Sequence, residues 1–193
     1  MALTTYTAGE VLTAASLNDN FDYAVTVPVA APAALVLVKS QAIGTAVTSV
    51  TVTGAFSATY ETYKIVISGT TSASTSDFMG LKLGSTATGY YSGGLGVRYD
   101  SGAGTTILKQ NNNTSSWLEV ATITNNVVFL NMEIVNPQLA ELTMFNAAVP
   151  AYNAGFFLSG YLNNSTSYTD FTITPTSGNI TGGTIYVYGY AKA

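Results

Sequence analysis

The stretch "GTIYVYGYA" at residues 183–191 separates two kinds of side chain onto alternate positions. One set is small or aliphatic, and consists of Ile185, Val187 and Gly189. The other set is aromatic, and consists of Tyr186, Tyr188 and Tyr190. Because successive side chains of a β-strand point to opposite faces of its sheet, this alternation predicts a strand with an aliphatic core face and a tyrosine face.

The tyrosine face admits three interpretations. Tyrosine buries a large apolar area and keeps a hydroxyl for hydrogen bonding, which suits a subunit interface formed by Tyr186, Tyr188 and Tyr190. The same side chains could instead cover the sheet of a single subunit or line a second core layer. A platform for stacking sugar rings is the third interpretation.

The rest of the chain after Leu35 repeats this pattern of short β-type runs separated by turn residues. In residues 62–69, Tyr63, Ile65 and Ile67 alternate with polar or smaller residues. The expected strands are 35–41, 47–54, 62–69, 78–84, 96–100, 105–110, 116–123, 127–135, 140–147, 155–162, 168–175 and 183–191. We therefore predict an all-β fold over residues 35–193, an antiparallel two-sheet sandwich of jelly-roll type.

The composition narrows the range of functions. Only 8% of the 193 residues are charged, against about 25% in ordinary soluble domains, although 47% are hydrophobic. Such a surface is typical of a protein that shares it with neighbours in an assembly. The net charge is −4 and the six basic residues are scattered singly, so we expect no nucleic-acid partner.

The chain contains no histidine and no cysteine, which removes the residues of Ser-His-Asp and Cys-His catalysis and of imidazole or thiolate metal sites. Catalysis would then depend on carboxylates, as in glycoside hydrolysis, where two must face each other across a cleft. The acidic residues at Asp77, Asp100, Glu119, Glu133, Glu141 and Asp170 show no spacing that pairs any two. We expect no enzymatic activity and no cofactor.

The first 25 residues differ from the rest. Thr7 and Glu10 fit a capping box, and apolar residues recur further on at helical spacing. We predict a short helical anchor over residues 1–25 that attaches the protein to a larger particle through Leu12, Leu17 and Phe21. The alternative is a helix that packs on the β-domain of its own chain.

Residues 26–34 are expected to form a linker that holds this anchor away from the domain. The surrounding apolar run, 27–38, is interrupted by Pro28 and Pro32 and is shorter than the roughly 18 apolar residues that a membrane span needs. We therefore expect no membrane insertion.

Two polar turns adjoin an aromatic residue and are the candidate sites for a glycan. Residues 111–116 precede Trp117, and residues 163–167 precede Tyr168. Amides that hydrogen-bond sugar hydroxyls beside an aromatic ring suit a saccharide, which selects Asn112, Asn113, Trp117, Asn164 and Tyr168 as candidate glycan contacts. The alternative is that both segments are ordinary hairpin turns and that Trp117 is a core or interface residue.

Four segments resemble parts of bacteriophage tail-fibre and other virion appendage proteins, particularly those of phages of marine bacteria and cyanobacteria. The segment "YTAGEVLTAASLNDNF" (6–21) is similar to their N-terminal attachment segment. The β-domain that follows it resembles theirs in "VTSVTVTGAFSATYETYKIVISG" (47–69), "LGSTATGYY" (83–91) and "ITGGTIYVYGYA" (180–191). Many such fibres carry a long shaft between the anchor and the head, whereas this chain has only a short linker.

The resemblance implies a homotrimeric structural protein of the virion, made in the host cytoplasm. It would be attached to other tail or capsid proteins through its N-terminus, with its β-domain facing outward towards host-surface polysaccharide. Tail and capsid attachment remain open alternatives, so a head decoration protein is the second candidate. A stand-alone carbohydrate-binding module is the third, and a small polysaccharide-degrading spike enzyme is the fourth.

Overall fold

The computed structural model describes residues 9, 13, 15, 35–99 and 106–192, with the side chains of 106–108 left aside. Residues 35–192 group into one compact unit. The anchor residues Leu12, Leu17 and Phe21 and the linker 26–34 lie outside the described residues, as does Asp100. The predicted helical anchor therefore stays a prediction.

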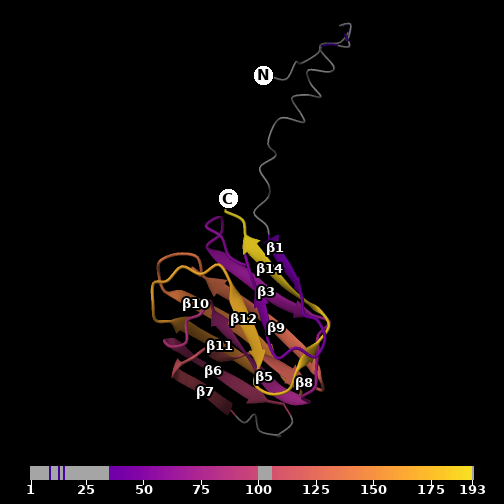
Figure 1. Ribbon diagram of the computed structural model, residues 1–193, viewed down its shortest axis with the longest axis vertical. Coiled ribbons are helices and arrows are strands. Elements are labelled where there is room, and N and C mark those ends of the chain that lie inside the picture. Colours follow the sequence, from indigo (N-terminus) through magenta and orange to yellow (C-terminus); the bar gives the residue numbers. More distant parts are fainter. Residues whose placement is uncertain (1–8, 10–12, 14, 16–34, 100–105, 193) are drawn as a thin grey trace. The chain divides into compact units, whose positions relative to one another are not determined.

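The described part of the β-domain contains two sets of antiparallel strands (Figure 1). The first set, here called the long sheet, has the order β1 (Leu35–Ala42), β14 (Thr184–Tyr190), β3 (Thr62–Ser68), β9 (Val127–Val135), β10 (Thr143–Pro150), β11 (Ala154–Leu162), β6 (Tyr90–Arg98) and β7 (Thr106–Thr114). The predicted all-β antiparallel class is confirmed.

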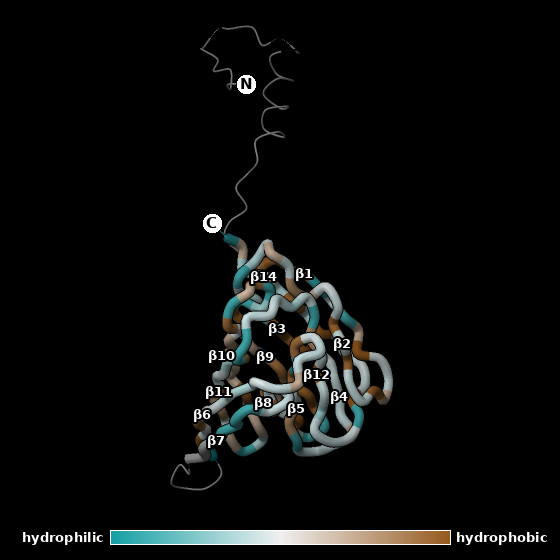
Figure 2. The backbone as a smooth tube through the Cα atoms, turned by 60° about the vertical axis from the view of Figure 1, so that its left-hand side comes forward, coloured by the Kyte–Doolittle hydropathy of each residue, from teal (hydrophilic) through white to brown (hydrophobic). Residues whose placement is uncertain are grey.

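The second set is here called the short sheet. Its order is β2 (Val50–Val52), β12 (Phe171–Pro175), β5 (Ser76–Leu83), β8 (Trp117–Thr124), the beginning of β9, β4 (Thr71–Ser72) and β13 (Ile180–Thr181). Figure 2 turns the domain so that β14, β3, β10, β11, β6 and β7 run along one side, with β2, β12 and β4 on the other.

Strand β9 belongs to both sheets. Its first residues pair with β8, from Val127 opposite Thr124 to Phe129 opposite Thr122. Its remaining residues pair with β3 on one side, and the last of these also pair with β10 on the other side. The turn before it, at Asn125 and Asn126, has φ of 48° and 64°, the left-handed pair that a tight two-residue hairpin requires.

One hydrophobic core joins the inward faces of the two sheets. The alternation predicted for residues 62–69 and 183–191 is confirmed, since Tyr63, Ile65, Ile185 and Val187 are fully buried and the intervening side chains are not. Aromatic rings bridge the sheets: Trp117 of β8 lies 4.6 Å from Phe145 of β10 between ring centroids. An aliphatic and aromatic interior of this kind gives the domain its main stabilisation.

Strands β6 and β7 are longer than predicted. The sequence indicated strands at 96–100 and 105–110 and a turn at 111–116, whereas β6 runs from Tyr90 to Arg98 and β7 continues to Thr114. Two glycines of β6, Gly94 and Gly96, resemble turn signals but serve close packing. A Cβ atom at Gly94 would overlap the carbonyl oxygen of Phe157, and one at Gly96 would overlap the ring of Phe156.

Substitution of Trp117, the single tryptophan of the chain, tests this core, because the side chain of Trp117 is 0% exposed. We expect Trp117→Ala to lower the free energy of unfolding by about 3–5 kcal/mol, since it leaves a large cavity between the sheets. Chemical denaturation followed by circular dichroism measures this loss, and Trp117→Phe, which keeps a ring, should lose much less. A loss below about 1 kcal/mol for the alanine variant would contradict the core assignment.

Candidate functional site

The outward side of the long sheet carries two surfaces of different chemistry, one on each side of β9. The first, here called the tyrosine face, lies on β1, β14 and β3. It consists of Leu35, Leu37, Val66, Tyr186, Tyr188 and Tyr190, and the strand register places Ser40 beside Tyr186 and Lys64 beside Tyr188 on the same side of the sheet. The second, here called the transverse groove, crosses β11, β6 and β7.

The tyrosine face combines exposed aliphatic side chains with hydroxyl-tipped rings. Leu35 lies opposite Tyr190 and Leu37 opposite Tyr188, and the two leucines are 45% and 53% exposed. The rings of Tyr186 and Tyr188 stack with centroids 6.3 Å apart. Since β1 pairs with β14 alone among the described strands, these leucines also lie along an edge of the sheet that these strands form. The three tyrosines thus occupy the outward positions that the alternation predicts.

Tyr190 is fixed at the boundary of this face. Its hydroxyl donates a hydrogen bond to Glu133 of β9. Glu133 lies opposite Lys64 across the β3–β9 pairing, and Lys64 lies opposite Tyr188 across the β14–β3 pairing. The hydrogen bond to Glu133, helped by partial burial and by the carboxylate charge, raises the pKa of Tyr190 to about 12.

The transverse groove is a hollow of about 430 Å³ on the other half of the sheet. Its lining consists of uncharged residues only: Tyr91, Ser92, Gly93, Gln110, Asn111, Asn112, Ser159, Gly160 and Tyr161. The hollow arises from two paired positions with little side chain, Gly93 of β6 opposite Ser159 of β11. A volume of this size lies within the range of ordinary ligand sites.

Large side chains flank the Gly93–Ser159 pair along the strands. On one side, Tyr91 and Tyr161 lie opposite each other and their rings stack almost in parallel, 4.9 Å apart between centroids. On the other side, Leu95 lies opposite Phe157, which is 76% exposed. The two large pairs, Tyr91–Tyr161 and Leu95–Phe157, thus form two walls, and the small Gly93–Ser159 pair forms the floor between them.

An irregularity in the β6–β7 pairing brings amides to the end of the groove. The register shifts between Tyr90 and Ser92, so that β7 supplies extra residues opposite Tyr91. Among them, Asn112 is exposed and lines the groove. Asn113, with φ of 53°, uses its side-chain oxygen to accept a hydrogen bond from the backbone N–H of Gly89 at 2.9 Å. Asn112 therefore keeps its candidate position, while Asn113 shapes the bulge.

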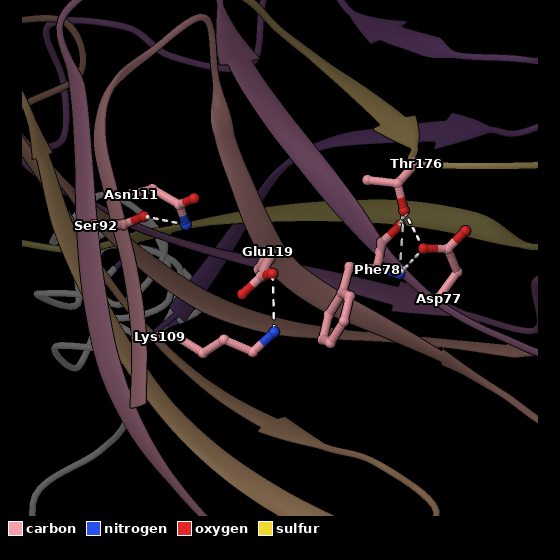
Figure 3. A network of polar contacts seen from close by, with 7 residues as sticks. All are labelled: Asp77, Phe78, Ser92, Lys109, Asn111, Glu119 and Thr176. Carbon is pink, nitrogen blue, oxygen red and sulfur yellow. Dashed lines mark hydrogen bonds and ion pairs between the residues drawn. The ribbon is translucent and has the colours of Figure 1, made fainter. Parts of the chain in front are cut away.

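The edge strand β7 is held in place from beneath, between the sheets (Figure 3). Lys109 forms an ion pair with Glu119 of β8, 3.0 Å between Nζ and Oε1, and its ammonium lies 4.3 Å from the ring centroid of Phe78. Asn111 donates to the Ser92 hydroxyl at 3.3 Å. Because both members of the ion pair are mostly buried, the contact is screened less than a surface pair and helps to fix the floor of the groove.

The structure corrects the predicted roles of Trp117 and Tyr168. Both rings are buried, Trp117 fully and Tyr168 to all but 4%, so neither presents a free face for a sugar to stack on. The indole N–H of Trp117 donates to the carbonyl oxygen of Tyr161 at 3.3 Å. The Tyr168 hydroxyl lies 2.7 Å from that of Thr86 and 2.8 Å from the side-chain nitrogen of Asn164. Asn164 therefore positions Tyr168 rather than offering a free amide.

The groove residues Tyr91, Gly93, Ser159 and Tyr161 were not selected from the sequence. A signal for them exists in the segments 91–95 and 157–161, in which every second residue runs large, small, large: Tyr91, Gly93 and Leu95 in the first, and Phe157, Ser159 and Tyr161 in the second. Their antiparallel pairing brings the two patterns into register. That pairing joins residues about 65 positions apart, and local alternation does not specify it.

The carboxylates in the described ranges have individual polar partners. Burial opposes ionisation of Asp77, but hydrogen bonds from Ser177, Thr176 and the backbone lower its pKa below the ordinary 3.8 (Figure 3). The Asn136 side chain donates to Glu141 at 3.3 Å. Among the described residues, no group of three acidic side chains is placed to hold a metal ion.

In the same ranges, no helix combines the length and apolarity needed to cross a membrane.

Comparison of the chain with protein-family models, with curated proteins and with solved structures gives no significant match.

The Tyr190–Glu133 contact predicts a pH dependence of stability. The pKa of Tyr190 is about 12 in the folded protein and near 10 in an unfolded chain. The contribution of Tyr190 is therefore complete below pH 10 and is lost as the pH rises towards 12. We expect wild type to be more stable than Tyr190→Phe at pH 8, with the difference shrinking between pH 10 and 12.

Thermal unfolding of the two proteins across this pH range measures the difference, and their comparison cancels the titration of the other tyrosines. Tyr152→Phe is the matched control, because Tyr152 is 77% exposed and should change nothing at any pH. A difference between wild type and Tyr190→Phe that persists unchanged at pH 12 would refute the assignment.

Proposed function

We propose that the chain is a non-enzymatic structural protein of a bacteriophage particle, a short homotrimeric fibre attached through its N-terminal segment. Its β-domain faces outward and contacts host-surface glycans. The observation that carries this proposal is the tyrosine face, a surface suited to burial against copies of the same chain. The resemblance of residues 6–21 and of the β-domain segments to phage appendage proteins supplies the biological setting.

The tyrosine face supports self-association on physical grounds. Leu35 and Leu37 expose apolar area next to the tyrosine rings, and burial of that area in a contact is favourable by about 25 cal/mol per Å². Tyrosine hydroxyls can find hydrogen-bond partners in such a contact, which avoids the cost of burying unpaired polar groups. The edge position of β1 adds unpaired backbone groups that a neighbouring copy can cover.

We also propose that the domain is a jelly roll with two added hairpins. In support, the chain order places β1-β14-β3-β9 in one sheet and β2-β12-β5-β8 in the other. On this interpretation, β6–β7 and β10–β11 are insertions that extend the first sheet beyond β9. Jelly rolls occur in viral capsid and lectin domains, an analogy that agrees with the proposal but carries no function by itself.

Two alternatives differ in where the protein acts. A head decoration protein would use the same β-domain with its N-terminus on the capsid instead of the tail. A stand-alone carbohydrate-binding module is favoured by one observation, the uncharged transverse groove. A free module would have no need of the tyrosine face, and the oligomeric state therefore discriminates between a module and an appendage.

The oligomeric state tests the interface. We expect the full chain to be a trimer at micromolar concentration by light scattering coupled to size exclusion. Tyr188→Asp should give a folded monomer, because a charge in a closed apolar contact is costly to desolvate. Tyr152→Asp replaces another exposed tyrosine, which lies outside the tyrosine face, and this variant should stay trimeric. A monomeric wild type would contradict the proposal, and so would a trimer unaffected by Tyr188→Asp.

Deletion of residues 1–34 tests the attachment. Because residues 35–192 form their own compact unit, the truncated protein should keep its β-type circular dichroism and its cooperative unfolding. It should fail to incorporate into particles, as measured by immunoblotting of purified virions. The double variant Leu17→Asp with Phe21→Asp should reproduce this defect in the full chain. Normal incorporation of the truncated protein would remove the N-terminal attachment from the proposal.

A further inference from the structure

Close packing requires glycine at several neighbouring positions, but it does not require glycine at position 93. In β6 and β11, a Cβ atom at Gly94, Gly96, Gly155 or Gly160 would overlap another part of the domain. At Gly93 the nearest atom to such a Cβ is the Lys109 carbonyl oxygen at 3.5 Å, an ordinary contact distance, and the backbone is not left-handed. Glycine inside a strand lowers stability, and where the fold does not require it, it often marks close approach of a ligand.

The space above Gly93 is the floor of the transverse groove, and its lining indicates the chemistry of an occupant. Two tyrosine rings, the Ser159 hydroxyl and the amides of Gln110 and Asn112 surround it, whereas the side chains of Ser92 and Asn111 pair on the inward side of the strands. Aromatic rings offer faces to the C–H groups of a pyranose, while amides and hydroxyls both donate to and accept from its hydroxyl groups. An uncharged lining offers no counter-ion to an anionic ligand.

The direction of the groove supports a chain-like occupant. A second hollow of about 350 Å³, lined by Asn146, Ala148, Phe157 and Ser159 among others, shares Ser159 with the first. The polar positions Gln110, Ser159 and Asn146 thus form a row across β7, β11 and β10, with Gly93 on β6 between the first two. Three strand spacings of about 4.8 Å make this row roughly 14 Å long.

We propose that the transverse groove binds a neutral polysaccharide chain that runs across strands β10, β11, β6 and β7. Gly93 provides the space, Tyr91 and Tyr161 form the stacking wall, and Asn112, Gln110 and Ser159 select hydroxyl groups. The inference deepens the proposed function, because it names the class of host-surface ligand and moves the contact from the predicted turns to the sheet. A peptide strand would pair with a sheet edge instead of lying across outward faces.

The experiment uses the full-length protein in affinity electrophoresis through gels that contain dextran, laminarin, mannan, agarose or anionic alginate. We expect retardation by at least one neutral polysaccharide and none by alginate. Tyr161→Ala should weaken the interaction about tenfold, equivalent to the loss of one aromatic contact. Gly93→Val should abolish it by filling the floor. Tyr152→Ala, which removes an exposed tyrosine outside the groove, should bind as wild type does.

Gly93→Val also provides a test that does not depend on the polysaccharide. If the space serves a ligand, valine in this strand should raise the melting temperature, by about 2 °C. A lowered melting temperature would mean that the fold needs the glycine and would overturn the inference. Failure of every neutral polysaccharide to retard the wild type would overturn it as well, as would equal retardation of the groove variants.

Light scattering on the same variants separates this inference from the proposed function. Gly93→Val and Tyr161→Ala should keep the oligomeric state of the wild type, because both positions lie apart from the tyrosine face. If either variant dissociates the oligomer, the groove is a subunit contact and the saccharide inference is wrong while self-association stands. If the wild type is monomeric but retains polysaccharide binding, the interface proposal fails and the groove stands.

Discussion

Strand β9 pairs with strands of both sheets, and the positions of both candidate surfaces depend on this double pairing. Its first residues complete the short sheet through the tight turn at Asn125 and Asn126, and its later residues pair with β3 and β10. The positions of β14 and β1 follow from β3, and those of β11, β6 and β7 follow from β10. A register slip of one residue in β9 would turn the buried Leu130, Met132 and Ile134 outward. The core therefore fixes the register that sets both the tyrosine face and the groove.

The sequence predicts the features that depend on local alternation. Residues 127–135 were expected as a strand with the bounds that β9 has, and the aliphatic and tyrosine sides of 184–190 were assigned correctly. The predicted bounds were too short at β6 and β7, where glycines and asparagines resemble turn residues. Gly94 and Gly96 lie within a strand because atoms of β11 occupy the space of their missing side chains. That reason involves residues 60 or more positions away, and no local pattern contains it.

The candidate glycan contacts show the same limit. Trp117 and Tyr168 adjoin polar segments, which favoured exposure, yet the polar atoms of both rings have partners distant in sequence. Tyr161 was missed because it belongs to an ordinary strand pattern, and Tyr91 because it lies outside the predicted strands. Only the pairing of β6 with β11 stacks the two rings. An aromatic residue beside a turn is thus weak evidence for a binding site. Two aromatic residues stacked on the outward side of paired strands form a stronger candidate, since the core does not need them there.

The low charge of the chain agrees with the proposed self-association through the outward side of the long sheet. A surface that closes against another copy disfavours unpaired charges, because their desolvation costs more than an exposed contact returns. In the proposed trimer, tyrosine meets this requirement, since its hydroxyl can be hydrated in the free subunit and hydrogen-bonded in the assembly. Two charged positions of the long sheet lie near opposite charges: Glu133, which accepts from Tyr190, lies opposite Lys64 in the strand register, and Lys109 pairs with Glu119 beneath the groove. The uncharged lining of the groove likewise suits the proposed ligand, because amides and aromatic rings contact hydroxyl groups better than ions do.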